Sequence, residues 1–399
     1  MASNTTAISR KLLAGFSWLM LAAVPLARAQ TSPPLPAAEP GLSYTNYLIA
    51  SGPWSVHVVK LDRSAGQLEL RSAHATGQAV GLAKLSDLMT GLNPAWGKPL
   101  AAINGDFYQM ERAFAGHPRG LQIVEGELFS APKGGVSFWL DAQGQPHATN
   151  VVSRLHLTWP DGNSLPIGLN EERLPTGVVL YSSAVGATTH TLRGRELVLE
   201  SAKGTDPLVL RPGKTLSAKV REIRPVGDTP ITPDTLVLSL GPALKNLPTL
   251  TTGAVVQISL ETLPSLAGAK TALSGGPVLI RAGQRQKARP DEAGSYESTT
   301  MFERHPRSAV GWNAREFFLV EVDGRQKNLS VGMTLDELAA EMAKLGCTDA
   351  TSFDGGGSAA LWYGGEIRSS PSEGHERIIA NALAIVRRQP GSLAPPPAK

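Results

Sequence analysis

The sequence has little cysteine: Cys347 is the one cysteine among 399 residues. A single cysteine excludes a disulfide bond within the chain and a zinc site built from cysteine thiolates. Because Cys347 directly follows the predicted end of a helix, we expect a small buried side chain there rather than a catalytic thiol. The chemistry of the chain must therefore come from other side chains.

Several familiar catalytic and nucleotide-binding motifs are also missing. The sequence has no G-x-S-x-G motif, none of its eight histidines has the H-E-x-x-H spacing, and no G-x-G-x-x-G opens a helix after a strand. Residues 213–215, Gly-Lys-Thr, resemble the end of a P-loop, but Leu208 stands where its first glycine should be. These absences argue against a lipase-like serine hydrolase, a zinc metalloprotease and a nucleotide-binding enzyme.

A strong excess of one charge is lacking too. The whole chain has 38 basic and 34 acidic residues, a formal net charge of +4. Residues 1–29 contain Arg10, Lys11 and Arg28 and no acid, so their removal would leave 35 basic residues against 34 acidic ones, a net charge of about +1. We therefore expect neither nucleic acid nor an anionic membrane surface as a partner.

The N-terminal segment has the features of an export signal. Arg10 and Lys11 precede an apolar stretch over residues 12–26, and residues 27–29, Ala-Arg-Ala, have the small-x-small pattern of a cleavage site. The stretch is shorter than the ~20 apolar residues that span a bilayer, although an uncleaved anchor stays open as an alternative. The sequence thus predicts a signal peptide at residues 1–29 and a secreted or periplasmic protein of a bacterial envelope, with no stable membrane insertion after cleavage.

Proline-rich segments flank one large domain. Residues 30–43 are predicted to be a flexible linker and residues 389–399 a flexible tail. Between them, residues 44–388 form short strand-like runs separated by turns, which favours an α+β fold, predominantly a β mixed sheet with a few packed helices. Residues 150–262, a series of short strands, are either an inserted lobe or part of the same sheet.

One helix can be placed closely, and it connects two strands. Thr334 and Glu337 form a capping box at its start, apolar residues recur at helical spacing over residues 335–345, and Gly346 suits the turn at its end. The strands before and after it, residues 317–322 and 350–353, could lie parallel as in a βαβ unit. Both strands are followed by an aspartate and glycine, and the carboxyl ends of parallel strands are where such sheets usually bind ligands.

Two segments combine polar side chains with glycine after a short buried strand. In the first, residues 104–108, Asn104 and Asp106 flank a glycine and two aromatic residues follow; an ordinary Asn-Gly turn is the plain alternative, but no hairpin strand follows. In the second, Ser274 precedes Gly275 and Gly276, whose backbone could approach a ligand and turn N–H groups toward an anion. A tight turn without a ligand is the alternative there.

Two further segments add positive charge and more glycine. Arg307 could grip a phosphate with two parallel hydrogen bonds, and His305 could act as an acid, a base or a phosphate partner; a surface pair at a strand start is the alternative. Residues 354–358, Asp-Gly-Gly-Gly-Ser, are the most specific segment, because three consecutive glycines are entropically costly unless the backbone needs unusual angles. A carboxylate before them and a hydroxyl after them indicate a site for a polar ligand.

Together these motifs resemble the signature of the phosphodiester glycosidase family. The resemblance runs over residues 100–388 and rests on the order of residues 104–108, 275–277, 307–311, 323–325 and 354–358, with residues 381–383 as a closing segment. It implies a phosphodiester glycosidase-like domain at residues 44–388 and hydrolysis of a sugar joined through its anomeric carbon to a phosphodiester. For an envelope enzyme the substrate would be a sugar-phosphate-containing glycan, such as a teichoic-acid-like, capsular or exopolysaccharide polymer.

The residues present supply the parts that this reaction needs. Asp106 and Asp354 could stabilise positive charge at the anomeric carbon or activate water, with Asn104 and His305 as further catalytic candidates. Arg307 could bind the phosphate. The other candidates for binding the substrate or its phosphate are Ser274, Gly275, Gly276, Gly355, Gly356, Gly357, Ser358, Arg119 and His117. No cofactor is certain; a divalent metal held by Asp323, together with Asp354, stays open, although nothing in the spacing demands one.

Two other functions stay open at this point. A non-catalytic envelope glycan-binding protein could use the same pocket, with tryptophans as stacking surfaces, although paired acids favour an enzyme. A metal-dependent phosphodiesterase would cleave the P–O bond rather than the C–O bond.

Overall fold

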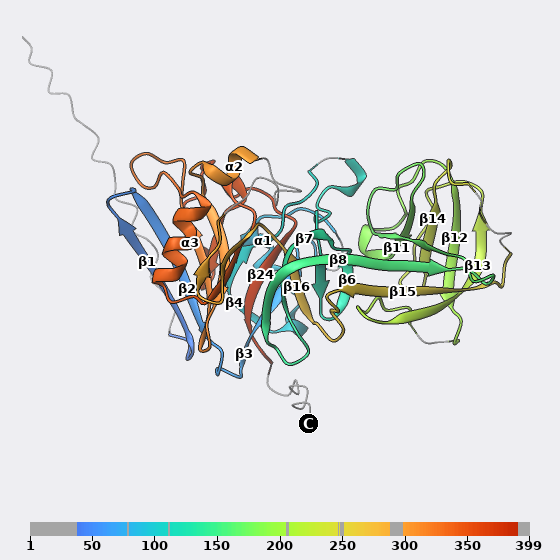
Figure 1. Cartoon of the computed structure of the whole chain (residues 1–399), viewed down its shortest axis with the longest axis horizontal. Helices are drawn as coiled ribbons and strands as arrows, with labels where there is room; N and C mark the ends of the chain where they lie inside the picture. Colours follow the sequence, from blue (N-terminus) through green and yellow to red (C-terminus); the bar gives the residue numbers. More distant parts are fainter. Residues whose placement is uncertain are drawn as a thin grey trace, which may run out of the picture. The chain divides into compact units, whose positions relative to one another are not determined.

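The computed structural model describes residues 38–389 except 78–79, 111, 205–206, 246, 248–250 and 288–297 (Figure 1). The predicted signal peptide, residues 30–37 of the predicted linker and residues 390–399 of the predicted tail lie outside the described residues. No helix in the described part of the chain is long and apolar enough to cross a membrane. The structure is mostly β, as predicted, and its few helices make the α+β label only approximate.

A seven-stranded antiparallel sheet carries most of the sequence motifs. Its order is β1-β2-β20-β19-β21-β17-β18. The bounds are β1 (Leu42–Ile49), β2 (Trp54–Asp62), β17 (Val278–Arg281), β18 (Gln284–Arg285), β19 (Arg307–Trp312), β20 (Glu316–Val322) and β21 (Asp349–Ser352). The sequence of β20 is almost wholly apolar because both faces are covered: Phe317 and Leu319 enter one core, whereas Phe318 and Val320 enter another.

A five-stranded sheet shares a core with the first. Its order is β23-β22-β4-β24-β3, and apolar residues of both sheets form one buried cluster. The bounds are β3 (Leu68–His74), β4 (Lys98–Asn104), β22 (Leu361–Tyr363), β23 (Glu366–Ile367) and β24 (Asn381–Arg387). Ile103, near the end of β4, belongs to this shared core, so Asn104 at the end of β4 lies near the seven-stranded sheet.

One helix packs against each of these two sheets, and Figure 1 shows α3 beside β1 and β2. On the seven-stranded sheet, α3 (Leu335–Lys344) buries Leu338 and Met342 and has the predicted capping box at Thr334. On the five-stranded sheet lies α1 (Leu85–Thr90), which buries Leu85, Leu88 and Met89. The remaining short helices are α2 (Ser298–Phe302), η1 (Pro94–Trp96), η2 (Arg112–Phe114), η3 (Ser183–Val185) and η5 (Gly356–Ser358). Cys347 is buried beside α3, which raises its thiol pKa to about 12, so it is not a reactive thiol.

A twelve-stranded sheet, nearly closed into a barrel, accounts for residues 122–274. One pair, β10 with β11, is parallel, and the other pairs are antiparallel. The bounds are β5 (Gln122–Val124), β6 (Glu127–Ser130), β7 (Lys133–Leu140), β8 (Pro146–Thr158), β9 (Ser164–Pro166), β10 (Gly168–Leu169), β11 (Val178–Tyr181), β12 (Arg195–Ser201), β13 (Thr215–Arg224), β14 (Leu236–Leu240), β15 (Val255–Leu263) and β16 (Thr271–Ser274). Residues 150–262 thus share one sheet with β5, β6, β7 and β16, which lie outside that range.

The two strands predicted to be parallel do run in the same direction, but they are not neighbours. Both β20 and β21 pair antiparallel with β19, which lies between them. Their carboxyl ends therefore meet at one edge of the sheet, together with the amino end of β19. This edge places Asp323, Arg307 and Asp354 in one region.

Candidate functional site

The end of β4 is tied directly to the segment after β21. Asp354 N–H donates to the Gly105 carbonyl at 3.0 Å, and Asn104 Nδ2 donates to the Asp354 carbonyl at 2.7 Å. Asn104 Oδ1 accepts from Ser308 Oγ at 2.6 Å and from Ala360 N–H at 3.2 Å. Asn104 is 1% exposed, and both its amide nitrogen and its amide oxygen are used in these hydrogen bonds. It therefore holds the loops of Asp106 and Asp354 together rather than facing a ligand.

Asp106 is a buried carboxyl group with a strongly shifted pKa. It is 4% exposed, its N–H donates to Asn381 Oδ1 at 2.8 Å, and its Oδ2 accepts from Gly120 N–H at 2.9 Å. Burial, with the nearby charge of Asp354 added, raises its pKa to about 8, against the lowering effect of the Gly120 and Phe107 N–H groups and of Arg119. Asp106 therefore holds a proton at neutral pH.

Asp354 is the second acid, and it differs from the first. Burial raises its pKa to about 6, while Arg377 and Arg119 lower it by stabilising the charged form. Asp354 is partly exposed and lines a pocket, whereas Asp106 is buried and is not among the residues that line it, although its neighbour Phe107 is. At pH 7 one carboxyl is mostly neutral and the other mostly ionised, the arrangement expected of an acid and its ionised partner in one site.

The pocket has a volume of about 190 Å³ and is rich in guanidinium groups. The lining residues that matter for the argument are Phe107, His305, Arg307, Arg325, Asp354 and Arg377. Arg307 is 8% exposed and donates to the carbonyls of Met333, Thr300 and Glu303, at 2.8, 2.5 and 2.7 Å. Most of its donors are therefore used to hold the pocket wall, in contrast to the phosphate grip predicted for it.

Arg325 and Arg377 are better placed to meet an anion. Arg325 is exposed, and its Nη2 lies 3.3 Å from His305 Nδ1. Arg377 is half-buried and forms an ion pair with Glu373. Both side chains reach the pocket that Asp354 lines, so positive charge stands beside the ionised acid.

The three consecutive glycines are explained by the backbone and by these arginines. Gly356 has φ +61°, a conformation that favours glycine, and it opens the short helix η5. At Gly357 a side chain would collide with the paired groups of Arg377 and Glu373. The glycines thus let Arg325 and Arg377 pack against the backbone after Asp354, while Ser358 is buried at the end of this turn.

His305 lines the same pocket as a neutral base. Burial, together with Arg307 and Arg325, lowers the pKa of its imidazole, and Glu303 Oε2 lies 3.3 Å from its Nε2. His305 is thus neutral at neutral pH, with Nδ1 positioned to accept from Arg325 and Nε2 to donate to Glu303.

Other predicted binding residues lie elsewhere or use their polar groups within the protein. Ser274 Oγ accepts from Leu121 N–H at 2.7 Å, and the N–H groups of Gly275 and Gly276 donate to the carbonyls of Val136 and Ser352 at 3.0 and 2.7 Å. Gly276 lines the pocket, but neither N–H is free for an anion.

Two more candidates from the sequence lie outside the pocket lining. His117 is buried, which lowers its pKa to about 4, and it is not among the residues that line the pocket. Arg119 is exposed and acts on the pKa values of Asp106 and Asp354 by its charge.

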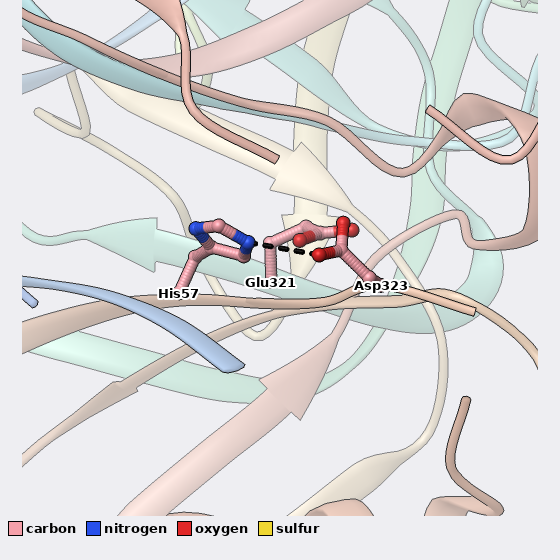
Figure 2. Close-up of side chains that lie close together, drawn as sticks. All are labelled: His57, Glu321 and Asp323. Atoms are coloured by element: carbon pink, nitrogen blue, oxygen red, sulfur yellow. Dashed lines mark hydrogen bonds and ion pairs between the residues drawn. The ribbon is translucent and has the colours of Figure 1, made fainter. Parts of the chain in front are cut away.

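Asp323 joins a different group from the one considered for a metal. It lies with His57 and Glu321 in a buried cluster whose ligand atoms are all within 4.8 Å of one another, and Asp354 is not part of it (Figure 2). His57 Nε2 lies 2.9 Å from Asp323 Oδ2. Burial and the adjacent Asp323 raise the pKa of Glu321 well above its usual value.

Sequence reasoning missed Arg325, Arg377, His57 and Glu321. Arg325 belongs to the Asp-Gly-Arg motif and follows a strand end, which is a signal that could have placed it at the site. Arg377 follows a turn with no motif, and His57 and Glu321 lie inside strands whose pattern predicts only burial.

Comparisons with known proteins agree with the resemblance found in the sequence. Residues 213–386 match the model of the phosphodiester glycosidase family, so the resemblance is confirmed for that part of the chain, which includes all its motifs except residues 104–108. No curated protein matches the chain.

Three solved structures are similar to this one. A hypothetical protein from Synechocystis is 21% identical with a TM-score of 0.70, over 89% of this chain and 64% of its own length. A candidate exported protein from Burkholderia pseudomallei is 25% identical with a TM-score of 0.66, over 84% of this chain and 74% of its own. The auto-inhibited catalytic domain of zebrafish N-acetylglucosamine-1-phosphodiester alpha-N-acetylglucosaminidase is 16% identical with a TM-score of 0.47, over 88% of this chain and 85% of its own.

Proposed function

We propose, on the premise that residues 213–386 match the phosphodiester glycosidase family, that this protein is a hydrolase that releases a sugar from a glycosyl phosphodiester. One observation carries the proposal: two neighbouring carboxyl groups have pKa values of about 8 and about 6, and the second lines a pocket that also holds arginines. Glycosyl hydrolysis commonly uses such a pair of acids in different protonation states.

The arginines account for the phosphate. A phosphodiester is an anion, and guanidinium groups bind its oxygens with charge-assisted hydrogen bonds. Arg325 is exposed in the pocket and Arg377 lies beside Asp354, so the phosphate would lie between them and the sugar toward Phe107.

The two acids take different parts in the reaction. Asp354, ionised at neutral pH, stabilises the positive charge that develops at the anomeric carbon as the C–O bond breaks. Asp106, which keeps its proton and lies outside the pocket lining, supplies a proton to the leaving oxygen through a bridging water. A phosphate monoester is already a good leaving group, so we expect Asp354 to contribute more to the rate than Asp106.

The buried cluster of His57, Glu321 and Asp323 does not support a metal-dependent cleavage of the P–O bond in the pocket. His57, Glu321 and Asp323 are not among the residues that line the pocket. A cation held there would not contact a phosphate in the pocket, so it could not act on the phosphorus directly.

The substrate class follows from the expected export. The predicted signal peptide at residues 1–29 and the likeness to a candidate exported protein support an envelope location. We propose a sugar-phosphate-containing glycan of the envelope or an exopolysaccharide as the natural substrate.

The direct test is hydrolysis of a panel of sugar phosphodiesters, including UDP-N-acetylglucosamine and sugar-phosphate polymers, by the purified protein with and without chelator. We expect release of free sugar from at least one diester and none from simple glycosides that lack the phosphate. Binding without release across the whole panel would instead favour the non-catalytic glycan-binding function.

Replacing Arg325 by glutamine is expected to raise KM for the phosphodiester about 10- to 100-fold with a smaller change in kcat. A hydrogen bond to a charged group contributes about 1.5–3 kcal/mol, which corresponds to this loss of binding. Steady-state kinetics on the substrate found in the panel measure it.

A matched control is Arg224→Gln, because Arg224 is in β13 of the twelve-stranded sheet and pairs only with Glu222 at 3.7 Å among the ion pairs of the described residues. The control should leave KM unchanged. Equal KM values for the two variants would show that Arg325 does not bind the phosphate.

A further inference from the structure

Three side chains from the inner strands of the seven-stranded sheet meet at one buried point. His57 in β2 pairs in register with Glu321 in β20, and Asp323 follows the last residue of β20. The exposed fractions are 4% for His57, 1% for Glu321 and 1% for Asp323. Figure 2 shows the three side chains pointing toward one another.

One oxygen of this group has no hydrogen-bond partner among the described residues, namely Glu321 Oε2. Its side chain interacts with Asp323, and one carboxylate oxygen each of Glu321 and Asp323 lies within 4.8 Å of a ring nitrogen of His57. An ionised carboxylate is costly to bury unless it is paired or coordinates a metal. Two carboxyl groups and one imidazole that converge in the interior thus form a set of ligands that a cation could bind.

We propose that His57, Glu321 and Asp323 bind a divalent transition-metal ion, with zinc as the first candidate and manganese as the second. The donor set suits these ions, since imidazole nitrogen binds zinc well and carboxylate oxygen binds both. Around a tetrahedral ion with bonds of about 2.1 Å, neighbouring ligand atoms lie about 3.4 Å apart. The present spread, from 2.9 Å to within 4.8 Å, reaches that geometry by small side-chain movements.

Surrounding groups are arranged as in the outer shell of a metal site. Tyr44 Oη lies 2.7 Å from His57 Nδ1, so it can accept that N–H and leave Nε2 with a free lone pair. Ser370 N–H donates to Asp323 Oδ1 at 2.6 Å, which orients this carboxylate. Asn46 Nδ2 and Ser55 Oγ each lie 3.3 Å from His57 Nε2, where they could contact a water on the ion.

The ion would support the pocket rather than enter it. Asp323 begins the segment that carries Arg325, and its carboxylate holds Ser370, which begins the segment that carries Arg377. Gln326 and Ser370 link the same two segments by bonds of 2.8 and 2.9 Å. This consequence rests on the proposed function, since it makes the cation a support for the phosphate-binding arginines.

Metal content tests the proposal without any substrate. The purified, tag-free protein is stripped with chelator, incubated with zinc or with manganese, freed of excess metal, and its metal content measured by mass spectrometry. We expect about one ion per chain in the wild type and less than a tenth of that in Glu321→Gln and Asp323→Asn. The matched control is Asp141→Asn, which breaks a His–Asp pair of 2.8 Å at the surface and should keep the ion.

A second variant keeps the test decisive if the first two fail to fold. Tyr44→Phe keeps the ring that stacks on Tyr363 and removes only the hydroxyl, so metal affinity should fall about 10- to 100-fold. Metal content that is absent from the wild type, or equal in the wild type and Glu321→Gln, would overturn the proposal. Neither outcome depends on sugar release, so loss of the proposed function leaves this test intact.

Discussion

Replacing Asp354 by asparagine is expected to lower kcat/KM for sugar release by roughly 10³-fold or more. The amide removes the negative charge that stabilises the cationic anomeric carbon, and losses of this order are typical of removing a charge or donor aimed at the transition state. Steady-state kinetics with the substrate found in the panel measure the effect. Asp349→Asn, at the amino end of β21, the strand that precedes Asp354, should leave kcat/KM unchanged.

The same variant should not destabilise the fold. Burial raises the pKa of Asp354 to about 6 in the folded protein, above the unfolded value near 3.9. Protonation of Asp354 therefore adds to the free energy of unfolding below about pH 4, and this stabilisation is lost as the pH rises through 6. An amide has no such pH-dependent penalty, so the thermal midpoint at pH 7.5 should be equal to or above that of the wild type. A drop of many degrees would instead assign Asp354 a structural role.

Replacing Asp106 by asparagine is expected to lower kcat/KM by roughly 10²-fold, the lower end for loss of a general acid, because phosphate leaves readily. The pH profile separates this role from a passive one. With Asp354 near 6 and Asp106 near 8, wild-type kcat/KM should rise from pH 5 and fall above pH 8. In Asp106→Asn the fall at high pH should disappear while the rise at low pH stays.

This second variant should also gain stability at high pH. The folded-state pKa of Asp106 is raised to about 8, so its stabilising contribution is present below pH 4 and is lost progressively as the pH rises to 8. The asparagine can still accept the Gly120 N–H, so the thermal midpoint at pH 8 should rise more than at pH 5. A variant that loses stability at both pH values, and retains the high-pH fall in activity, would refute the assignment.

Much of the site's position could be predicted from local sequence. Asp106 and Asp354 each follow a short buried strand, and the capping box at Thr334 fixed the helix between the two parallel strands. Because strand direction decides which ends meet, this pattern was enough to predict that Asp323 and Asp354 share one edge.

The roles of individual side chains could not be predicted in the same way. Arg307 has the residue type expected for phosphate, yet the carbonyls that use its donors come from residues 300, 303 and 333. His57 and Glu321 meet only because β2 and β20 pair across 264 residues of chain, which no local pattern records. Likewise, the sheet that contains residues 150–262 also includes β5, β6, β7 and β16. Local sequence does not show which strands join one sheet, because the pairing partners lie far apart in the chain.

The measurement that tests the central claim most directly is hydrolysis of a cleaved phosphodiester in oxygen-18 water. If the protein breaks the bond between the anomeric carbon and oxygen, the label enters the released sugar and the phosphate stays unlabelled. This is the result that the acids and arginines of the pocket predict. Label in the phosphate would show P–O cleavage and would contradict the glycosidase assignment.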